Sequence, residues 1–260
     1  MPGSSPMLKR VSLPTATAAV HLLFAATAFA SEPPPPSWGS ICSELELAEE
    51  AEKRVSAASR CALALERIFG PDDRRLVGHF SEIAERLSAG GGVSAGAALP
   101  YRRRAHRAAM RLYGQASPEA GGAALRYARA KILAGRCEPQ SAEALDLLNA
   151  AASGMRAADG AARLSGMRDV ARGFADSLAF KQATALLLEA GGADGAALSV
   201  GDWERIGVWR TRVGDAAAAV DAFRRALRLD PPQHDRLRIR QSLRQALYEA
   251  GDFEGLRALP

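Results

Sequence analysis

The stretch that decides the fold is GDWERIGVWRTRVGDAAAAVDAFRRALRLDPP, residues 201–232. Small residues recur in it at Gly207, Gly214 and Ala219, and Pro231 lies near its end. Gly214 divides two segments of helical spacing, so we expect it in a turn, where a residue without a side chain lets the chain reverse. Gly207 and Ala219 are expected where the two helices approach closely. The stretch predicts a packed antiparallel helix pair that leaves one face open for a copy of itself.

Degenerate copies of this pattern lie on both sides. Ala183 lies 36 residues before Ala219 and begins the same spacing of apolar residues. Gly251 lies 37 residues after Gly214, and an aspartate follows each of these glycines. Ala144 begins the second-helix pattern once more. Repeat periods in the mid-thirties are typical of a helical solenoid.

Helical spacing continues over the rest of the chain, and no stretch alternates as a strand does. From Ile41 to Phe69 the apolar residues step by three or four, with no Gly or Pro between them, which predicts one long helix over about Trp38–Phe69. Further helices are expected over about 71–87, 101–113, 125–133, 142–152, 161–176, 178–190, 202–213, 216–229, 237–250 and 253–259. The sequence therefore predicts an all-α protein.

Residues 203–231 resemble the tetratricopeptide repeat. The positions that carry the resemblance are Trp203, Ile206, Gly207, Gly214, Ala219, Phe223, Ala226 and Pro231. Arg210 stands where that family usually has an aromatic residue, and residues 136–155 are similar to the related Sel1-type repeat. The resemblance implies an α-solenoid, a superhelix of antiparallel helix pairs, over 119–260. A helical region at 40–118, which contains the long N-terminal helix, precedes it.

In a solenoid of this kind, the first helix of each pair lines a concave groove. Matching the sequence to that geometry nominates ten groove residues: Arg168, Arg172, Glu204, Val208, Thr211, Arg212, Arg238, Gln241, Gln245 and Tyr248. Because guanidinium pairs bidentately with carboxylate, the four arginines favour a protein or peptide partner with acidic side chains or a free carboxylate. The resemblance implies a non-catalytic protein–protein interaction scaffold.

Residues 1–30 have the pattern of a signal peptide. Two basic residues precede the uncharged segment Leu13–Phe29, and a small-x-small motif ends at Ala30. We expect cleavage after Ala30, a periplasmic or secreted product, and an extended proline-rich linker at 31–39. No later stretch is long and apolar enough to cross a bilayer. The excess of Arg, Ala and Gly indicates GC-rich coding in a bacterium.

The main charge feature is a basic segment at residues 101–114. Its arginines are Arg102, Arg103, Arg104, Arg107 and Arg111. They predict contact with a membrane surface, an anionic envelope polymer or an acidic protein, or else they form the solvated face of a helix. The formal charge of +5 falls to +3 without the two basic residues of segment 1–30, which is too mild to indicate a nucleic-acid partner.

Three cysteines leave the disulfide pairing open. In one straight helix Cys42 and Cys61 would lie roughly 28 Å apart, whereas a disulfide needs Cα atoms within about 7 Å. The long-helix prediction therefore excludes a bridge between these two. Either Cys137 pairs with Cys42 or Cys61, or all three thiols are free.

Motifs of catalysis are sparse, and we expect no enzyme, cofactor or metal. Residues 92–96 fit the G-x-S-x-G spelling around Ser94, but no strand is predicted before the serine, as a nucleophile elbow requires. Metal-binding spacings of His and Cys are missing, and a nucleophilic pair of Cys61 with His79 is only one combination among several. The alternative is an enzyme of the cell envelope, for example one acting on peptidoglycan, or an accessory to one, with a site in 40–118.

Overall fold

The described part of the protein consists of helices. The computed structural model describes residues 37–89, 95–135 and 141–259, and these ranges contain no strand. The helices are α1 (Trp38–Leu47), α2 (Ala51–Phe69), α3 (Arg75–Ala89), α4 (Leu99–Tyr113), α5 (Pro118–Leu133), α6 (Ala142–Arg156), α7 (Gly160–Asp176), α8 (Phe180–Gly191), α9 (Val200–Arg212), α10 (Ala216–Arg228), α11 (Gln233–Ala250) and α12 (Phe253–Arg257). A 3-10 turn, η1 (Ala95–Ala98), leads into α4. The prediction of an all-α protein is confirmed.

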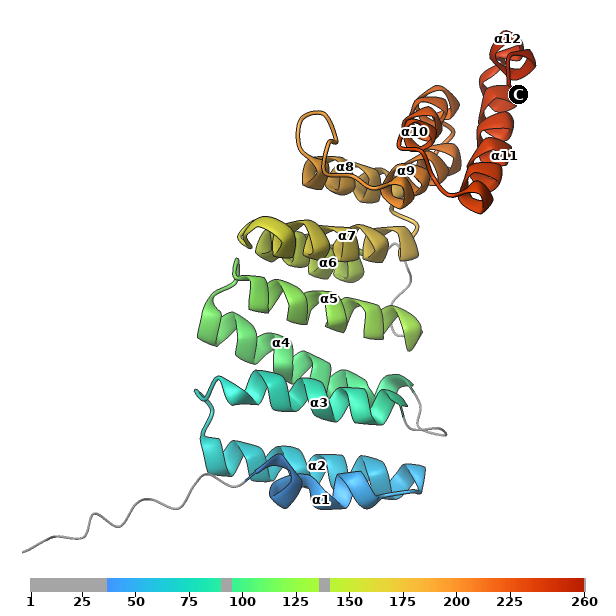
Figure 1. Ribbon diagram of the computed structural model, residues 1–260. Coiled ribbons are helices and arrows are strands. Elements are labelled where there is room, and N and C mark those ends of the chain that lie inside the picture. Colours follow the sequence, from blue (N-terminus) through green and yellow to red (C-terminus); the bar gives the residue numbers. More distant parts are fainter. Residues whose placement is uncertain (1–36, 90–94, 136–140, 260) are drawn as a thin grey trace, which may run out of the picture. The chain divides into compact units, whose positions relative to one another are not determined.

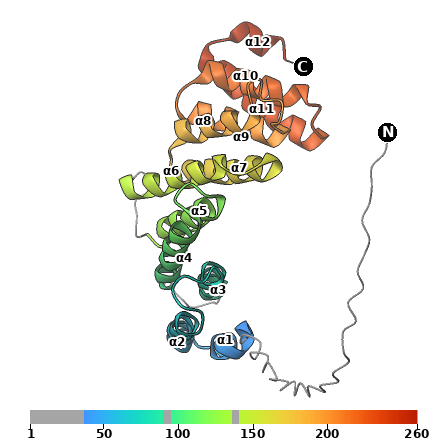
Figure 2. The same ribbon diagram turned by 90° about the vertical axis from the view of Figure 1, so that its left-hand side faces the viewer.

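Neighbouring helices in the chain are neighbours in space (Figure 1, Figure 2). Helix α5 packs on α6, α7 on α8 and α9 on α10, and each of these pairs also contacts the next. Helix α4 packs on α5, so the two regions predicted at 40–118 and 119–260 are in direct contact. Short connections and helices amphipathic along one stripe favour this stacking in sequence order.

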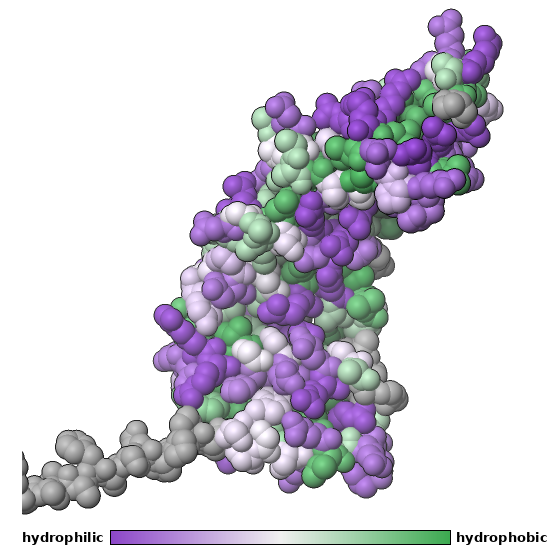
Figure 3. Space-filling view, viewed as in Figure 1, coloured by the Kyte–Doolittle hydropathy of each residue, from purple (hydrophilic) through white to green (hydrophobic). Residues whose placement is uncertain are grey.

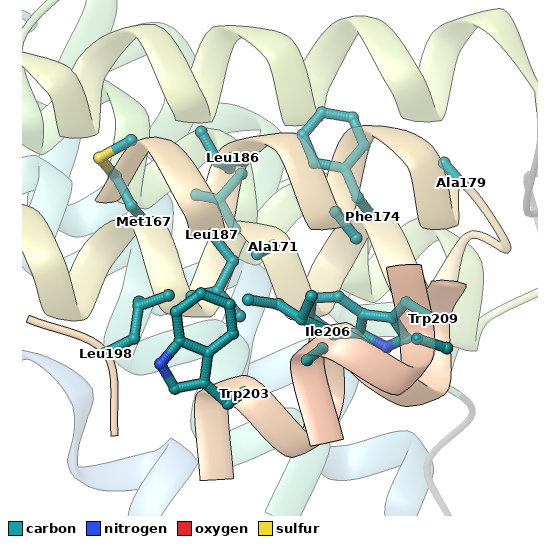
Figure 4. Packing of buried hydrophobic residues seen from close by; sticks show 14 of the residues in the cluster. Met167, Ala171, Phe174, Ala179, Leu186, Leu187, Leu198, Trp203, Ile206 and Trp209 are labelled. Carbon is teal, nitrogen blue, oxygen red and sulfur yellow. The ribbon is translucent and has the colours of Figure 1, made fainter. Parts of the chain in front are cut away.

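The core runs between the helix pairs. One hydrophobic cluster extends without interruption from Ala124 in α5 to Leu247 in α11. This cluster includes Phe174 of α7, the leucines of α8, and Trp203 and Ile206 of α9 (Figure 4). A second cluster, from Cys42 to Ala105, fills the space among α1 to α4. Each pair therefore buries its apolar side chains against the next pair rather than within itself alone.

The small residues of the opening stretch have the predicted roles. A Cβ atom on Gly207 would lie 2.6 Å from the ring of Phe223, so only glycine allows α9 and α10 to pack around that ring. Gly214 lies between these helices with φ +78°, in the left-handed region that favours glycine. Ala219 is fully buried. The predicted helix pair is confirmed.

The prediction of one long helix over Trp38–Phe69 is wrong. The helix ends at Leu47, Ala48 adopts an extended conformation, and α2 begins at Ala51. Arg54 stabilises the break, because its guanidinium donates to the backbone carbonyls of Ala48 (3.1 Å) and Glu49 (2.9 Å). The apolar spacing is continuous through the break, so it could not reveal that the chain reverses there.

The reversal also overturns the predicted disulfide pairing. Cys42 and Cys61 form a disulfide, with their Cα atoms 5.0 Å apart. Both are buried in the contact between α1 and α2. Our exclusion of this pair assumed a straight helix, and it failed with that assumption. Neither Cys42 nor Cys61 is left to pair with Cys137, which lies outside the described residues.

We expect loss of this disulfide to release α1 and to leave the rest of the fold intact. Helix α1 packs mainly on α2, so it has few other contacts to hold it. Trp38 of α1 stacks on His79 of α3, with 5.5 Å between ring centroids. Replacing both bridged cysteines with alanine should shift the emission of Trp38 to longer wavelength, while the urea midpoint by circular dichroism changes little.

The same fluorescence shift in a Trp38→Phe background would show that another tryptophan is responsible. A large fall in the urea midpoint would show that the bridge stabilises the whole array.

Candidate functional site

A hollow of about 640 Å³ lies between α9 and α11, and Phe223 of α10 is among its lining residues. Its lining residues are Val208, Thr211, Arg212, Phe223, Gln241, Ser242, Gln245 and Glu249. Helix α10 separates α9 from α11 in the chain and packs on both, which holds the two lining helices apart. This volume falls in the range of ligand-binding clefts.

The hollow combines an apolar floor with a polar rim. Phe223 lies buried at its base, and Val208, which is 40% exposed, supplies apolar surface. Gln245 donates a hydrogen bond of 2.7 Å to the carboxylate of Glu249. Arg212 is exposed and, within the described residues, has no ion-pair partner. The hollow can therefore offer amide groups, one guanidinium and one carboxylate around an apolar floor.

Half of the ten nominated groove residues line this hollow. They are Val208, Thr211, Arg212, Gln241 and Gln245. The prediction missed Phe223, Ser242 and Glu249. Ser242 and Glu249 share helical spacing with the two glutamines, which was a usable signal, whereas the buried Phe223 is indistinguishable in sequence from any core residue.

The side chain of Arg168 is bound to another residue of the same chain. Its guanidinium donates two hydrogen bonds, of 2.9 and 2.5 Å, to one carboxylate oxygen of Asp202, which is 1% exposed. Ser199 donates to the same oxygen through its backbone N–H and its hydroxyl. Burial would raise the pKa of Asp202, but the hydrogen bonds from Ser199 and the nearby Arg168 outweigh it and hold that pKa below its usual value. Arg168 thus ties α7 to α9.

Arg238 makes the equivalent connection between α9 and α11. It binds Glu204 bidentately, at 2.6 and 2.7 Å, and also contacts Asp235 at 2.8 Å. The partners lie 34 residues apart, as Arg168 and Asp202 do. Two of the four arginines nominated for the groove, Arg168 and Arg238, are therefore already ion-paired within the protein. In the sequence, the only trace of these two pairs is opposite charges at the same offset of 34 residues.

The remaining two nominated residues lie outside the hollow. Arg172 forms an exposed ion pair with Asp169, one turn away on α7, at 3.1 Å. Tyr248 is 63% exposed and meets the ring of Phe253 edge-on at 6.2 Å between centroids. Neither lines the site between α9 and α11.

The five arginines of α4 do not form one patch. Arg102 is 11% exposed and points to Glu85 of α3, at 3.5 Å. Arg103 is exposed to solvent. Arg104, Arg107 and Arg111 line a second hollow of about 320 Å³ beside α3. The helix turns its arginines to different sides because successive residues on a helix point about 100° apart.

The candidate nucleophiles are not assembled for catalysis in the described residues. Cys61 is bridged to Cys42 and has no thiol, so the pairing with His79 as a nucleophile and base is wrong. His79 is stacked between the rings of Trp38 and Phe69, and burial together with the nearby Arg75 lowers its pKa. Burial also lowers the pKa of His106. Ser94 lies outside the described residues.

The described residues include neither a metal-ligand cluster nor a membrane-spanning helix. They contain no group of three or more His, Cys, Asp or Glu side chains placed to hold a metal ion. Within the same residues, no helix has the length and hydropathy to cross a membrane. The face shown in Figure 3 is mostly hydrophilic, with hydrophobic residues in small separate areas.

Compared with models of known protein families the chain matches none, and no curated protein is significantly similar to it.

Proposed function

We propose that this protein is an exported, non-catalytic binding protein of the helical-repeat class. Its partner is a segment of another protein, bound in extended form in the hollow between α9 and α11. The observation that carries this proposal is the composition of that hollow, with apolar residues at its base, two glutamines, and the guanidinium of Arg212, which has no ion-pair partner in the described part of the chain. Signal-peptide patterning of residues 1–30 supports export.

Recurring features support a tetratricopeptide-like solenoid. A left-handed residue recurs at Leu178, Gly214 and Gly251, which are 36 and 37 residues apart. Two arginine–carboxylate pairs, Arg168 with Asp202 and Arg238 with Glu204, each span 34 residues and join the first helices of successive pairs. Turns and ion pairs that recur at similar intervals along the chain are expected of a stack of related units.

The chemistry of the hollow favours a peptide over a small apolar ligand. Gln241 and Gln245 have both donors and acceptors, which suit the N–H and C=O groups of an extended main chain. Arg212 suits a carboxylate, and Glu249 suits a donor or a cation on the same segment. The preferred segment therefore has mixed polarity with one carboxylate, rather than the strongly acidic character that four free arginines would have favoured.

The test selects peptides from a random displayed library on the full chain and measures their affinity by fluorescence anisotropy. Arg212→Gln should weaken the peptides that carry a carboxylate by about tenfold, since it removes one charge-assisted hydrogen-bonding group. Gln241→Ala with Gln245→Ala should weaken all the selected peptides.

The matched control is Arg172→Gln, an exposed arginine on the first helix of the preceding pair. It should change the affinity less than about twofold. Peptides whose affinity is equal for the wild type and for the variants of Arg212, Gln241 and Gln245 would contradict the proposal.

A further inference from the structure

Three arginines of α4 converge on a hollow that the peptide site does not use. Arg104, Arg107 and Arg111 follow each other at steps of three and four residues, so they lie on one face of the helix. The hollow has a volume of about 320 Å³ and lies between α4, α3 and the chain that joins α2 to α3. Its other lining residues are Glu66, Pro71, Leu76, Phe80 and Ala108. None of them belongs to α9, α10 or α11.

Two of these arginines have weak intramolecular partners. Arg104 lies 3.6 Å from Glu66, and Arg111 lies 3.2 Å from Asp72 and donates to the backbone carbonyl of Pro71. Both ion pairs have exposed side chains, and such pairs contribute little because water screens them. A ligand that binds several guanidinium groups at once can therefore bind them beside the carboxylates of Glu66 and Asp72, or displace those carboxylates.

Arg107 lies between the other two arginines in the sequence of α4. It is exposed and, among the described residues, has no hydrogen-bond or ion-pair partner. Three guanidinium groups face two carboxylates around the hollow, which leaves a net positive charge at its rim. An unneutralised guanidinium with five N–H donors is a ready partner for an anion.

The floor of this hollow is apolar. Leu76, Phe80 and Ala108 line it and are each at most 5% exposed. The guanidinium of Arg104 lies 5.9 Å from the centroid of the Phe80 ring, so the cationic rim and the apolar floor are in direct contact. A ligand suited to both has an anionic group attached to a small apolar body.

We propose that the hollow between α3 and α4 is a second binding site, for a small organic phosphate monoester. A phosphate dianion presents three oxygens, so it can accept from Arg107 and also from the remaining N–H groups of Arg104 and Arg111. A single carboxylate, with two oxygens, does this less well. A carboxylate ligand would compete on equal terms with Glu66 and Asp72, which are held nearby by the chain itself.

A membrane surface fits this site less well than a discrete ligand does. The volume is that of a small molecule, and the apolar residues are at the floor, where a flat surface does not reach.

The experiment titrates phenyl phosphate into the full chain at low ionic strength by isothermal calorimetry. We expect saturable binding at one site, and at least about tenfold weaker binding to Arg107→Gln, which removes one charge-assisted donor group. The matched control is Arg103→Gln, which removes the same charge from the same helix but does not line the hollow. It should change the affinity less than about twofold. Circular dichroism checks that both variants fold.

Three results would overturn the proposal. The first is absence of saturable binding by the wild type. The second is an equal loss in the variants of Arg103 and Arg107, which would mean attraction by net charge alone. The third is affinity for benzoate as high as for phenyl phosphate, or binding to phosphatidylglycerol vesicles that phenyl phosphate does not compete away. Either part of the third result would assign the arginines to a different ligand.

Discussion

Replacing Asp202 with alanine should lower the free energy of unfolding by about 3 kcal/mol, the low end of the cost of breaking a buried ion pair. The carboxylate is 1% exposed and accepts hydrogen bonds from Arg168 and Ser199. Its removal leaves these donors without an acceptor where α7 meets α9. The cost stays at the low end because Arg168 is itself 26% exposed and can regain water. Urea denaturation followed by circular dichroism measures the change.

The effect of Asp202 should depend on pH. Its pKa is lower in the folded protein than the value of about 3.9 usual for an unfolded aspartate. A lowered pKa means that the stabilisation is complete above the unfolded pKa and is lost as the pH falls through the folded value. The stability difference between wild type and Asp202→Ala should therefore stay constant above about pH 5 and narrow below about pH 4.

The control for this prediction is Asp169→Ala. Asp169 also pairs with an arginine of α7, but both side chains are exposed and the pair lies within one helix. Its loss should cost less than about 1 kcal/mol, as is usual for surface ion pairs. Equal costs for the two aspartates would show that the tie between α7 and α9 contributes nothing specific.

Replacing Gly154 with alanine should destabilise the protein by at least about 2 kcal/mol, through overpacking. A Cβ atom there would lie 2.7 Å from the Cα atom of Gly121 and would also clash with the backbone carbonyl of Ser117. Backbone atoms of a helix cannot move aside as a side chain can, so α5 and α6 would have to separate. The expected result is a lower urea midpoint with unchanged helical content.

Gly122→Ala is the matched control, in the same pair of helices. The nearest atoms to its Cβ are the flexible ends of Arg126 and Met155, at 3.6 and 3.7 Å, which is ordinary contact. Since alanine is favoured over glycine in a helix interior by up to about 1 kcal/mol, this variant should be slightly more stable than wild type. A gain in stability for Gly122→Ala with a loss for Gly154→Ala would establish the close approach of the two backbones. A gain in stability for both variants would refute it.

Local patterns predicted the helices and several of their ends. Apolar spacing located almost every helix after residue 70, because burial of one stripe imposes a period of 3.6 residues on the sequence itself. Gly214 and Gly251 marked turns, since a backbone with positive φ restricts the residue type at that one position. The aspartate after each glycine accepts a hydrogen bond from the first turn of the next helix, another constraint confined to neighbouring residues.

Contacts between distant residues were predicted less well. Five of the eight residues that line the hollow between α9 and α11 were predicted, because they lie on helix faces that the helical spacing assigns. Whether an arginine in such a face is free depends on which acid lies opposite it, and that acid is 34 residues away for Arg168 and for Arg238. Periodicity along one helix contains no information about the charge on the next.

The sequence by itself determined that the chain is helical, where most helices lie, and which small residues allow close packing, because each of these depends on neighbours within a few positions. Only the tertiary structure decided that the chain reverses between α1 and α2, that Cys42 pairs with Cys61, and that Arg107 and Arg212 have no ion-pair partner among residues 37–89, 95–135 and 141–259. A reversal without Gly or Pro and an ion pair across helices are both set by energies that exist only once distant segments touch.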